Sequence, residues 1–172
     1  PRGSGPGPAI ALLALLSRVA GPSPCPPAVL GLSPLPHAFA ARDGRQCQLD
    51  DGWVVAATAA SLRHPAEMLA AEIRARAGVS VKVVTADPGS KAITLRLPHP
   101  APSLGAGPQA FGATDEGYRL DIDTAAVTVT ARTVRGVYYA TRTFLQLLSN
   151  RTAQAPAGVI DDKPDLPVRG FY

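Results

Sequence analysis

Two pairs of adjacent carboxylates, Asp115-Glu116 and Asp161-Asp162, are residues whose types could carry out general acid and base catalysis. Such catalysis requires two groups that face the same reacting bond. Neighbouring residues in a strand point to opposite faces of a sheet, so neither pair is placed to share a proton. We expect Asp115 and Glu116 to cap a turn, and we assign no catalytic residue within this chain.

The three histidines lack the spacing of a metal site. His37 and His64 each lie beside a proline, and His99 lies between Pro98 and Pro100. None is paired at i, i+4 on a helix, as a helical metal site would require. We therefore expect solvated loop histidines, no bound metal and no cofactor. The sequence also contains no Gly-rich phosphate loop after a strand and no Gly-x-Ser-x-Gly elbow.

The positive charge is spread along the chain. The formal net charge is +4, from 17 Lys and Arg against 13 Asp and Glu, with no run of basic residues. Nucleic-acid sites gather basic residues on one face and interleave them with aromatic side chains. Aromatic residues make up only 5% of this sequence. The pattern argues against a nucleic-acid partner.

Residues 1–32 differ from the rest and have the features of a leader. Arg2 precedes an apolar stretch over residues 9–16, which breaks at Gly21-Pro22-Ser23-Pro24. A basic start, a short apolar core and a helix-breaking exit are typical of a secretory signal peptide, and the stretch is too short to span a membrane. We expect a secreted or cell-surface protein; an irregular apolar leader is the alternative. In an oxidising compartment Cys25 and Cys47 could pair.

The spacing of apolar residues after the leader predicts alternating strands and helices. Apolar positions three and four apart predict helices, and alternation predicts strands. The expected strands cover residues 53–57, 79–83, 93–97, 118–122 and 127–131, the last two as a hairpin, and the expected helices cover 62–77 and 133–149. This order favours an α+β fold, with a mostly antiparallel sheet and both helices packed on one face.

Five segments in this order carry a family resemblance. They are Glu116–Leu120, Val127–Ala131, Arg135–Leu148, Ile160–Pro164 and Arg169-Gly170. Together they resemble the non-catalytic N-terminal domain of β-N-acetylhexosaminidases of glycoside hydrolase family 20, running into the first strand of the catalytic barrel. The match covers roughly residues 33–172. It departs at Ala140, where the family more often has Gly, a change that a helix accommodates easily.

The resemblance implies a division of the chain. Residues 33–155 would form the zincin-like α+β domain, and residues 156–172 would form a linker and the first strand of a TIM barrel that continues beyond Tyr172. In the family, the Arg of the Arg-Gly pair binds hydroxyls of the terminal N-acetylhexosamine. That role falls on Arg169, whose planar guanidinium can donate two directed hydrogen bonds. The alternative is that Arg169 pairs with Asp162 or Asp165.

The resemblance also implies a substrate and a mechanism. Family members remove terminal β-linked GlcNAc or GalNAc from glycans by substrate assistance, in which the acetamido oxygen of the substrate attacks the anomeric carbon. An Asp orients that oxygen, and the adjacent Glu protonates the leaving group. We expect this pair beyond Tyr172, so residues 1–172 alone should be inactive.

Two other interpretations stay open on the sequence. Family 84 β-N-acetylglucosaminidases have a similar leading domain, and their barrels also begin near an Arg-Gly pair. A stand-alone carbohydrate-binding or scaffold module is the third interpretation. The low aromatic content argues against it, because sugar-binding sites stack aromatic rings on pyranose rings.

Overall fold

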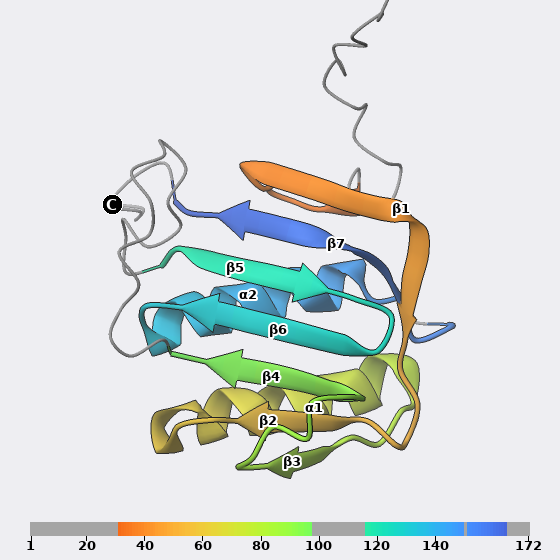
Figure 1. The fold of residues 1–172 in the computed structure, drawn as a ribbon, viewed down its shortest axis with the longest axis vertical. Helices are drawn as coiled ribbons and strands as arrows, with labels where there is room; N and C mark the ends of the chain where they lie inside the picture. The colour runs from red at the N-terminus through yellow and green to blue at the C-terminus, as the bar shows by residue number, and fades with distance from the viewer. Residues whose placement is uncertain (1–30, 98–115, 150, 165–172) are drawn as a thin grey trace, which may run out of the picture.

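A computed structural model describes residues 31–97, 116–149 and 151–164 as one seven-stranded sheet and two helices. The strands lie in the order β1-β7-β5-β6-β4-β2-β3 (Figure 1). Their bounds are β1 Ala38–Gln48, β2 Val54–Ala57, β3 Lys82–Val84, β4 Ala92–Arg96, β5 Tyr118–Ile122, β6 Ala126–Ala131 and β7 Gln154–Asp162. The helices are α1 Arg63–Ala77, preceded by a 3-10 turn at Ala60–Leu62, and α2 Val134–Leu147.

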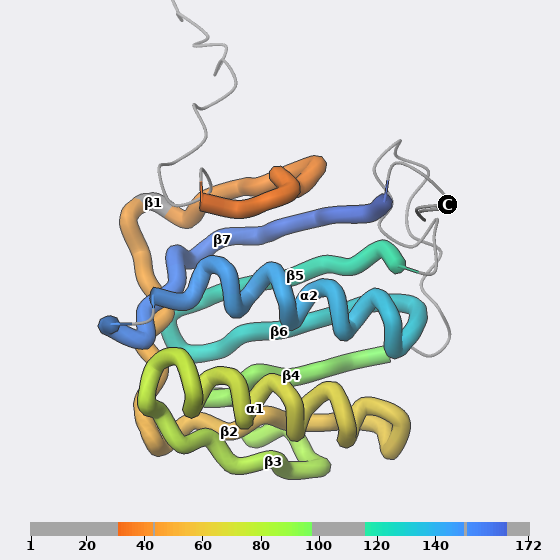
Figure 2. The backbone as a smooth tube through the Cα atoms, turned by 180° about the vertical axis from the view of Figure 1, so that it is seen from behind, coloured from red at the N-terminus to blue at the C-terminus, as the bar shows by residue number. Residues whose placement is uncertain are grey.

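Both helices cover the same face of the sheet (Figure 2). This arrangement confirms the α+β class and the helix packing that the sequence predicts. The sheet is mixed: β6, β5, β7 and β1 pair antiparallel, whereas β6, β4, β2 and β3 pair parallel. The expected hairpin of β5 and β6 is confirmed. One half of the sheet is therefore parallel. Parallel neighbours require a crossover connection, and α1 supplies the one between β2 and β3.

The core lies between the sheet and the helices. Leu120 and Ile122 of β5 and Val127 and Val129 of β6 alternate onto the helix side and are fully buried. Phe144 of α2 is likewise fully buried. Each such side chain contributes about 1.5–3 kcal/mol relative to exposure. Alternation on the strands and helical spacing on α2 therefore converge on one apolar layer.

Local signals define the ends of the helices. The Thr133 hydroxyl accepts a hydrogen bond from the Gly136 amide at 3.2 Å, which caps the start of α2. α1 ends at Gly78, whose φ of 72° lies in the left-handed region that favours glycine. Neither helix in the described ranges is both long and apolar enough to cross a membrane.

The two strands of the β1–β7 pair are absent from the predicted elements. β7 occupies Gln154–Asp162, so residues 156–162 lie in the sheet of this domain, whereas residues 156–172 are predicted to form a linker and a barrel strand. Pro156 and Gly158 obscure this strand in the sequence, because both residue types are uncommon inside strands. β1 is also irregular, because a register shift between Ala41 and Gln46 interrupts its pairing with β7. The domain therefore extends at least to Asp162. Residues 1–30 of the leader lie outside the described ranges.

We predict that Gly136→Ala destabilises the protein. A Cβ at this position would lie 2.6 Å from the Gly117 carbonyl oxygen and 2.8 Å from the Ala131 Cβ. The clash should lower the free energy of unfolding by about 1–3 kcal/mol, although Ala normally favours a helix over Gly. Urea unfolding followed by circular dichroism measures the change. Ala75→Gly, at an exposed position of α1, is the control and should cost about 1 kcal/mol. A more stable Gly136→Ala variant would contradict the prediction.

Candidate functional site

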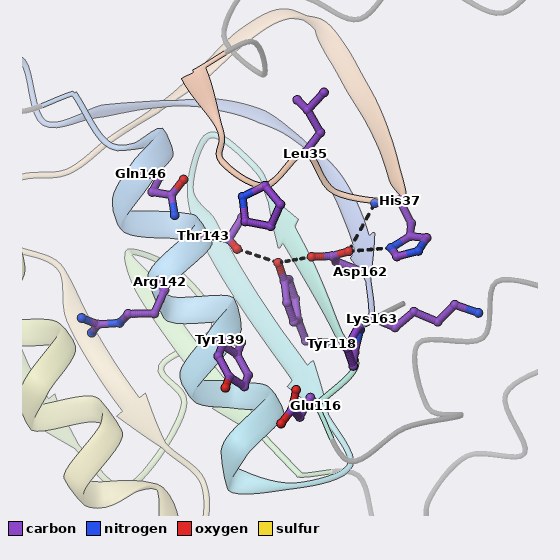
Figure 3. A pocket seen from close by; sticks show the side chains of 12 residues that line it. Leu35, His37, Glu116, Tyr118, Tyr139, Arg142, Thr143, Gln146, Asp162 and Lys163 are labelled. Carbon is purple, nitrogen blue, oxygen red and sulfur yellow. Dashed lines mark hydrogen bonds and ion pairs between the residues drawn. The ribbon is translucent and has the colours of Figure 1, made fainter. Parts of the chain in front are cut away.

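A shallow pocket of about 230 Å³ lies where the end of β7 meets β5, α2 and the segment before β1. Figure 3 shows side chains from all four segments around it. Tyr118 begins β5, Asp162 ends β7, Thr143 lies on α2 and His37 precedes β1. The pocket thus gathers residues from distant parts of the chain, such as His37 and Asp162, which are 125 positions apart.

A chain of hydrogen bonds connects these four residues (Figure 3). The Tyr118 hydroxyl lies 2.5 Å from Thr143 Oγ1 and donates to Asp162 Oδ2 at 3.0 Å. The other carboxylate oxygen, Oδ1, accepts the His37 backbone amide at 3.3 Å and lies 2.8 Å from His37 Nδ1. Asp162 is therefore engaged through both oxygens.

These contacts indicate where the hydroxyl protons of Tyr118 and Thr143 lie. Burial raises the pKa of Tyr118 well above its usual range, so the phenol stays protonated. Its proton goes to the Asp162 carboxylate, which only accepts when ionised, so Thr143 must donate its own proton to the Tyr118 oxygen. The contacts with Tyr118 and His37 hold the Asp162 carboxylate in a fixed orientation. The arrangement is suited to holding chain segments together.

Arg142 of α2 also lines the pocket, and its guanidinium extends toward α1 (Figure 3). Its guanidinium contacts the Glu72 carboxylate of α1 and lies over the Tyr138 ring, 4.9 Å from the ring centroid. Nε and Nη2 of Arg142 are buried and have no hydrogen-bond partner among the described residues. Arg142 therefore connects the two helices.

The structure separates the two adjacent carboxylates of β7, as expected. Asp162 faces the helices, whereas Asp161 lies 3.7 Å from Arg119 of β5, on the opposite face. Burial raises the pKa of Asp161, and the nearby Asp121 adds to this effect. The two carboxyl groups thus cannot act on one bond, which confirms the argument from strand geometry.

The structure describes some of the other residues that the sequence analysis singles out and not others. His37 is exposed in the loop before β1, as expected, and it also contacts Asp162, 125 residues later. His64 is exposed in the first turn of α1. His99, Asp115 and Arg169 lie outside the described residues, so the sugar contact of Arg169 stays a prediction. Within the described ranges, no three metal-ligating side chains come together.

The open face of the sheet carries paired charges. Arg42 of β1 reaches Asp121 of β5 at 2.7 Å and Asp123 at 3.5 Å. Asp121 lies between the buried Leu120 and Ile122 of β5, so its side chain faces away from the core. The Arg partner of these carboxylates lies about 80 residues away and gives no local signal.

Cys47 lies in the core. Its side chain is fully buried, and burial raises the pKa of its thiol to about 12. The thiol is free in this structure. Cys25 lies outside the described residues, so its pairing with Cys47 stays a prediction.

Comparison with known sequences identifies the family. The sequence model for glycosyl hydrolase family 20, domain 2, matches residues 29–163. The chain belongs to glycosyl hydrolase family 20. This match covers most of the chain, confirms the resemblance and favours family 20 over family 84.

Two curated relatives agree with the family. The chain is 26% identical over 152 residues to a beta-hexosaminidase of Porphyromonas gingivalis, covering 83% of this chain and 18% of the relative. It is 32% identical over 111 residues to a lacto-N-biosidase of Bifidobacterium bifidum, covering 64% of this chain and 9% of the relative. The chain therefore spans less than a fifth of either protein.

Solved structures show the same domain. The N-acetyl-beta-hexosaminidase of Streptomyces plicatus superimposes with a TM-score of 0.66 at 26% identity, covering 85% of this chain and 28% of that one. The GH20 beta-N-acetylhexosaminidase of Streptomyces coelicolor gives 0.61 at 25% identity, covering 78% and 26%. The family 20 chain described here thus has the fold of a hexosaminidase N-terminal domain.

We predict that Tyr118→Phe destabilises the domain by about 1–3 kcal/mol, because it removes hydrogen bonds to the half-buried Thr143 and to the half-buried carboxylate of Asp162. Tyr138→Phe, which removes an exposed hydroxyl, is the control and should change stability by less than about 0.5 kcal/mol. Thermal or urea unfolding measures both variants. Equal effects in the two variants would contradict the prediction.

We also predict that the stability difference between the parent protein and Tyr118→Phe depends on pH. Since folding raises the pKa of Tyr118, its contribution to stability is complete below the unfolded pKa of about 10 and is lost at higher pH. The stability difference between the parent and Tyr118→Phe should therefore shrink as pH rises above about 10. A difference that widens there would contradict the raised pKa.

Proposed function

We propose that this chain is the N-terminal supporting domain of a secreted, exo-acting β-N-acetylhexosaminidase that removes terminal GlcNAc or GalNAc from glycans. The family 20 match over residues 29–163 is the observation that carries the proposal. The hexosaminidase relatives and structures support it, because the chain matches about a fifth to a quarter of their length. The remaining length is available for a catalytic domain.

The proposed reaction is retaining hydrolysis with substrate assistance. The acetamido oxygen of the substrate attacks the anomeric carbon as the glycosidic bond breaks, and a Glu gives its proton to the leaving oxygen. Water then opens the cyclic intermediate and restores the acetamido group, and the Glu recovers its proton. We place this Glu and the Asp that orients the acetamido group beyond Tyr172.

Arg169 is the one residue of this chain that we assign to the sugar. The family motif supports this assignment, since the residue is the Arg of the Arg-Gly pair that follows Asp161-Asp162-Lys163-Pro164. A guanidinium can donate two parallel hydrogen bonds to neighbouring hydroxyl oxygens, which fixes the orientation of the sugar ring. From the signal-peptide features of residues 1–32, we infer that the protein is exported.

Hydrolysis of a chromogenic β-N-acetylglucosaminide tests the proposal. The 172-residue chain and the full-length product of its gene are assayed side by side. We expect activity only in the full-length product. Activity of the 172-residue chain alone would place the catalytic carboxylates within it and overturn the proposal. Inactivity of both, combined with glycan binding by the short chain, would favour the carbohydrate-binding module.

We predict that Arg169→Lys in the full-length product lowers kcat/KM about 10- to 100-fold, because Lys cannot reproduce a bidentate contact. Arg151→Lys, at an exposed position after α2, is the matched control and should keep the activity within about twofold of the parent. Equal kinetics for the two variants would remove Arg169 from the sugar site.

A further inference from the structure

Asp161 is a carboxylate in the interior of the sheet. It lies on β7, between β1 and β5, and its Cα partners are Ala38 on β1 and Arg119 on β5 (Figure 1). The side chain is 25% exposed, but its Oδ1 atom is buried and has no hydrogen-bond partner among the described residues. An ionised oxygen in this position has lost water without gaining a donor, which is unfavourable.

β5 brings one positive and one negative group to Asp161. The Arg119 guanidinium lies 3.7 Å from Asp161 Oδ2, which is too far for a hydrogen bond, and the Arg119 side chain is 47% exposed to screening by water. Asp121 places a like charge on the same face of the same strand. Burial raises the pKa of Asp161, Arg119 opposes this change, and Asp121 adds to it.

The arginines of β1 serve other carboxylates. Arg42 donates to both oxygens of Asp121, at 2.7 and 3.3 Å, and lies 3.5 Å from Asp123. Arg45 also acts electrostatically on Asp123. On the open face of β1, β7 and β5, Asp161 is therefore the carboxylate whose negative charge is least well compensated.

We propose that Asp161 is a proton-binding site through which mild acidification tightens the β1–β7–β5 part of the sheet. A proton from solvent removes the buried negative charge and supplies a hydroxyl that can donate a hydrogen bond, which the ionised carboxylate cannot do. Loss of that proton loosens β7 between its two neighbours. The inference rests on contacts among the described residues and is independent of the proposed function.

Asp87 is a matched carboxylate with the opposite expectation. Its side chain is 22% exposed, close to the 25% of Asp161. It accepts the Gly89 amide at 2.8 Å and pairs with Arg96, and these contacts lower its pKa. It lies in the connection between β3 and β4, away from β1 and β7. Ionisation thus favours the folded state at Asp87 and opposes it at Asp161.

The first test needs no substitution. The carboxyl carbons of the 172-residue chain are followed by NMR as the pH is varied. We expect Asp161 to titrate above the ordinary aspartate value of about 3.9 and Asp87 to titrate below it. A midpoint for Asp161 at or below about 3.9 would overturn the proposal.

The second test compares urea unfolding of the parent, Asp161→Asn and Asp87→Asn at two pH values. Because folding raises the pKa of Asp161, its contribution to stability is complete below the unfolded value of about 3.9 and is lost as pH rises through the folded value. Asn has nearly the shape of Asp and stays neutral. Relative to the parent, the unfolding equilibrium constant of Asp161→Asn should fall at least about threefold between about pH 3.5 and pH 7. That of Asp87→Asn should rise, and the same trend in both variants would contradict the proposal.

The third test asks whether the effect acts on β7. Hydrogen exchange is measured at about pH 7, where Asp161 of the parent is ionised. We expect the amides of residues 158–161 to exchange at least about threefold more slowly in Asp161→Asn than in the parent, and those of residues 92–96 on β4 to change less. Unchanged exchange in β7, or an equal change in β7 and β4, would overturn a specific action of the proton on β7.

Discussion

The position of β7 between β1 and β5 is the constraint on which the rest of the domain depends. This strand comes last among the described elements, yet it pairs with β1, the first, and with β5 near the middle of the sequence. The sheet is therefore complete only when the end of the domain has folded back onto its beginning. Gly158 permits this contact, because a Cβ there would lie 2.7 Å from the Ala40 carbonyl oxygen and from the Phe39 ring.

The two faces of the sheet carry different kinds of side chain. The helix side is a continuous apolar core that α1 and α2 cover. The open side carries pairs such as Arg42 with Asp121, which join β1 to β5 across β7. Partly exposed pairs of this kind contribute little to stability, so the apolar layer dominates the energy of the fold. The polar network around Asp162 lies at the end of that layer, where the core meets solvent.

The functional proposal rests on the family 20 match over residues 29–163. Within the described domain, the Asp162 carboxylate accepts hydrogen bonds from the Tyr118 hydroxyl and from the His37 backbone amide. These contacts join the end of β7 to the segment before β1 and to β5.

The sequence by itself determined the family, both helices and the β5–β6 hairpin, because each of these depends on residues close together in the chain. Leu120, Ile122, Val127 and Val129 alternate as a half-buried hairpin must, and the Arg135–Leu148 segment carries both helical spacing and the family motif. Strand geometry also requires that neighbours such as Asp161 and Asp162 face opposite ways, whereas the pairing with β1 and β5 decided that this segment is a strand.

Only the tertiary structure decided what depends on distant partners. β1 and β7 are irregular in sequence and become strands by pairing with each other, and the parallel half of the sheet depends on crossovers that local propensity does not specify. The contact between His37 and Asp162 spans 125 residues and is not encoded by either segment alone. Short-range patterns specify elements, whereas long-range burial and hydrogen bonding select their partners and bring the residues of the candidate site together.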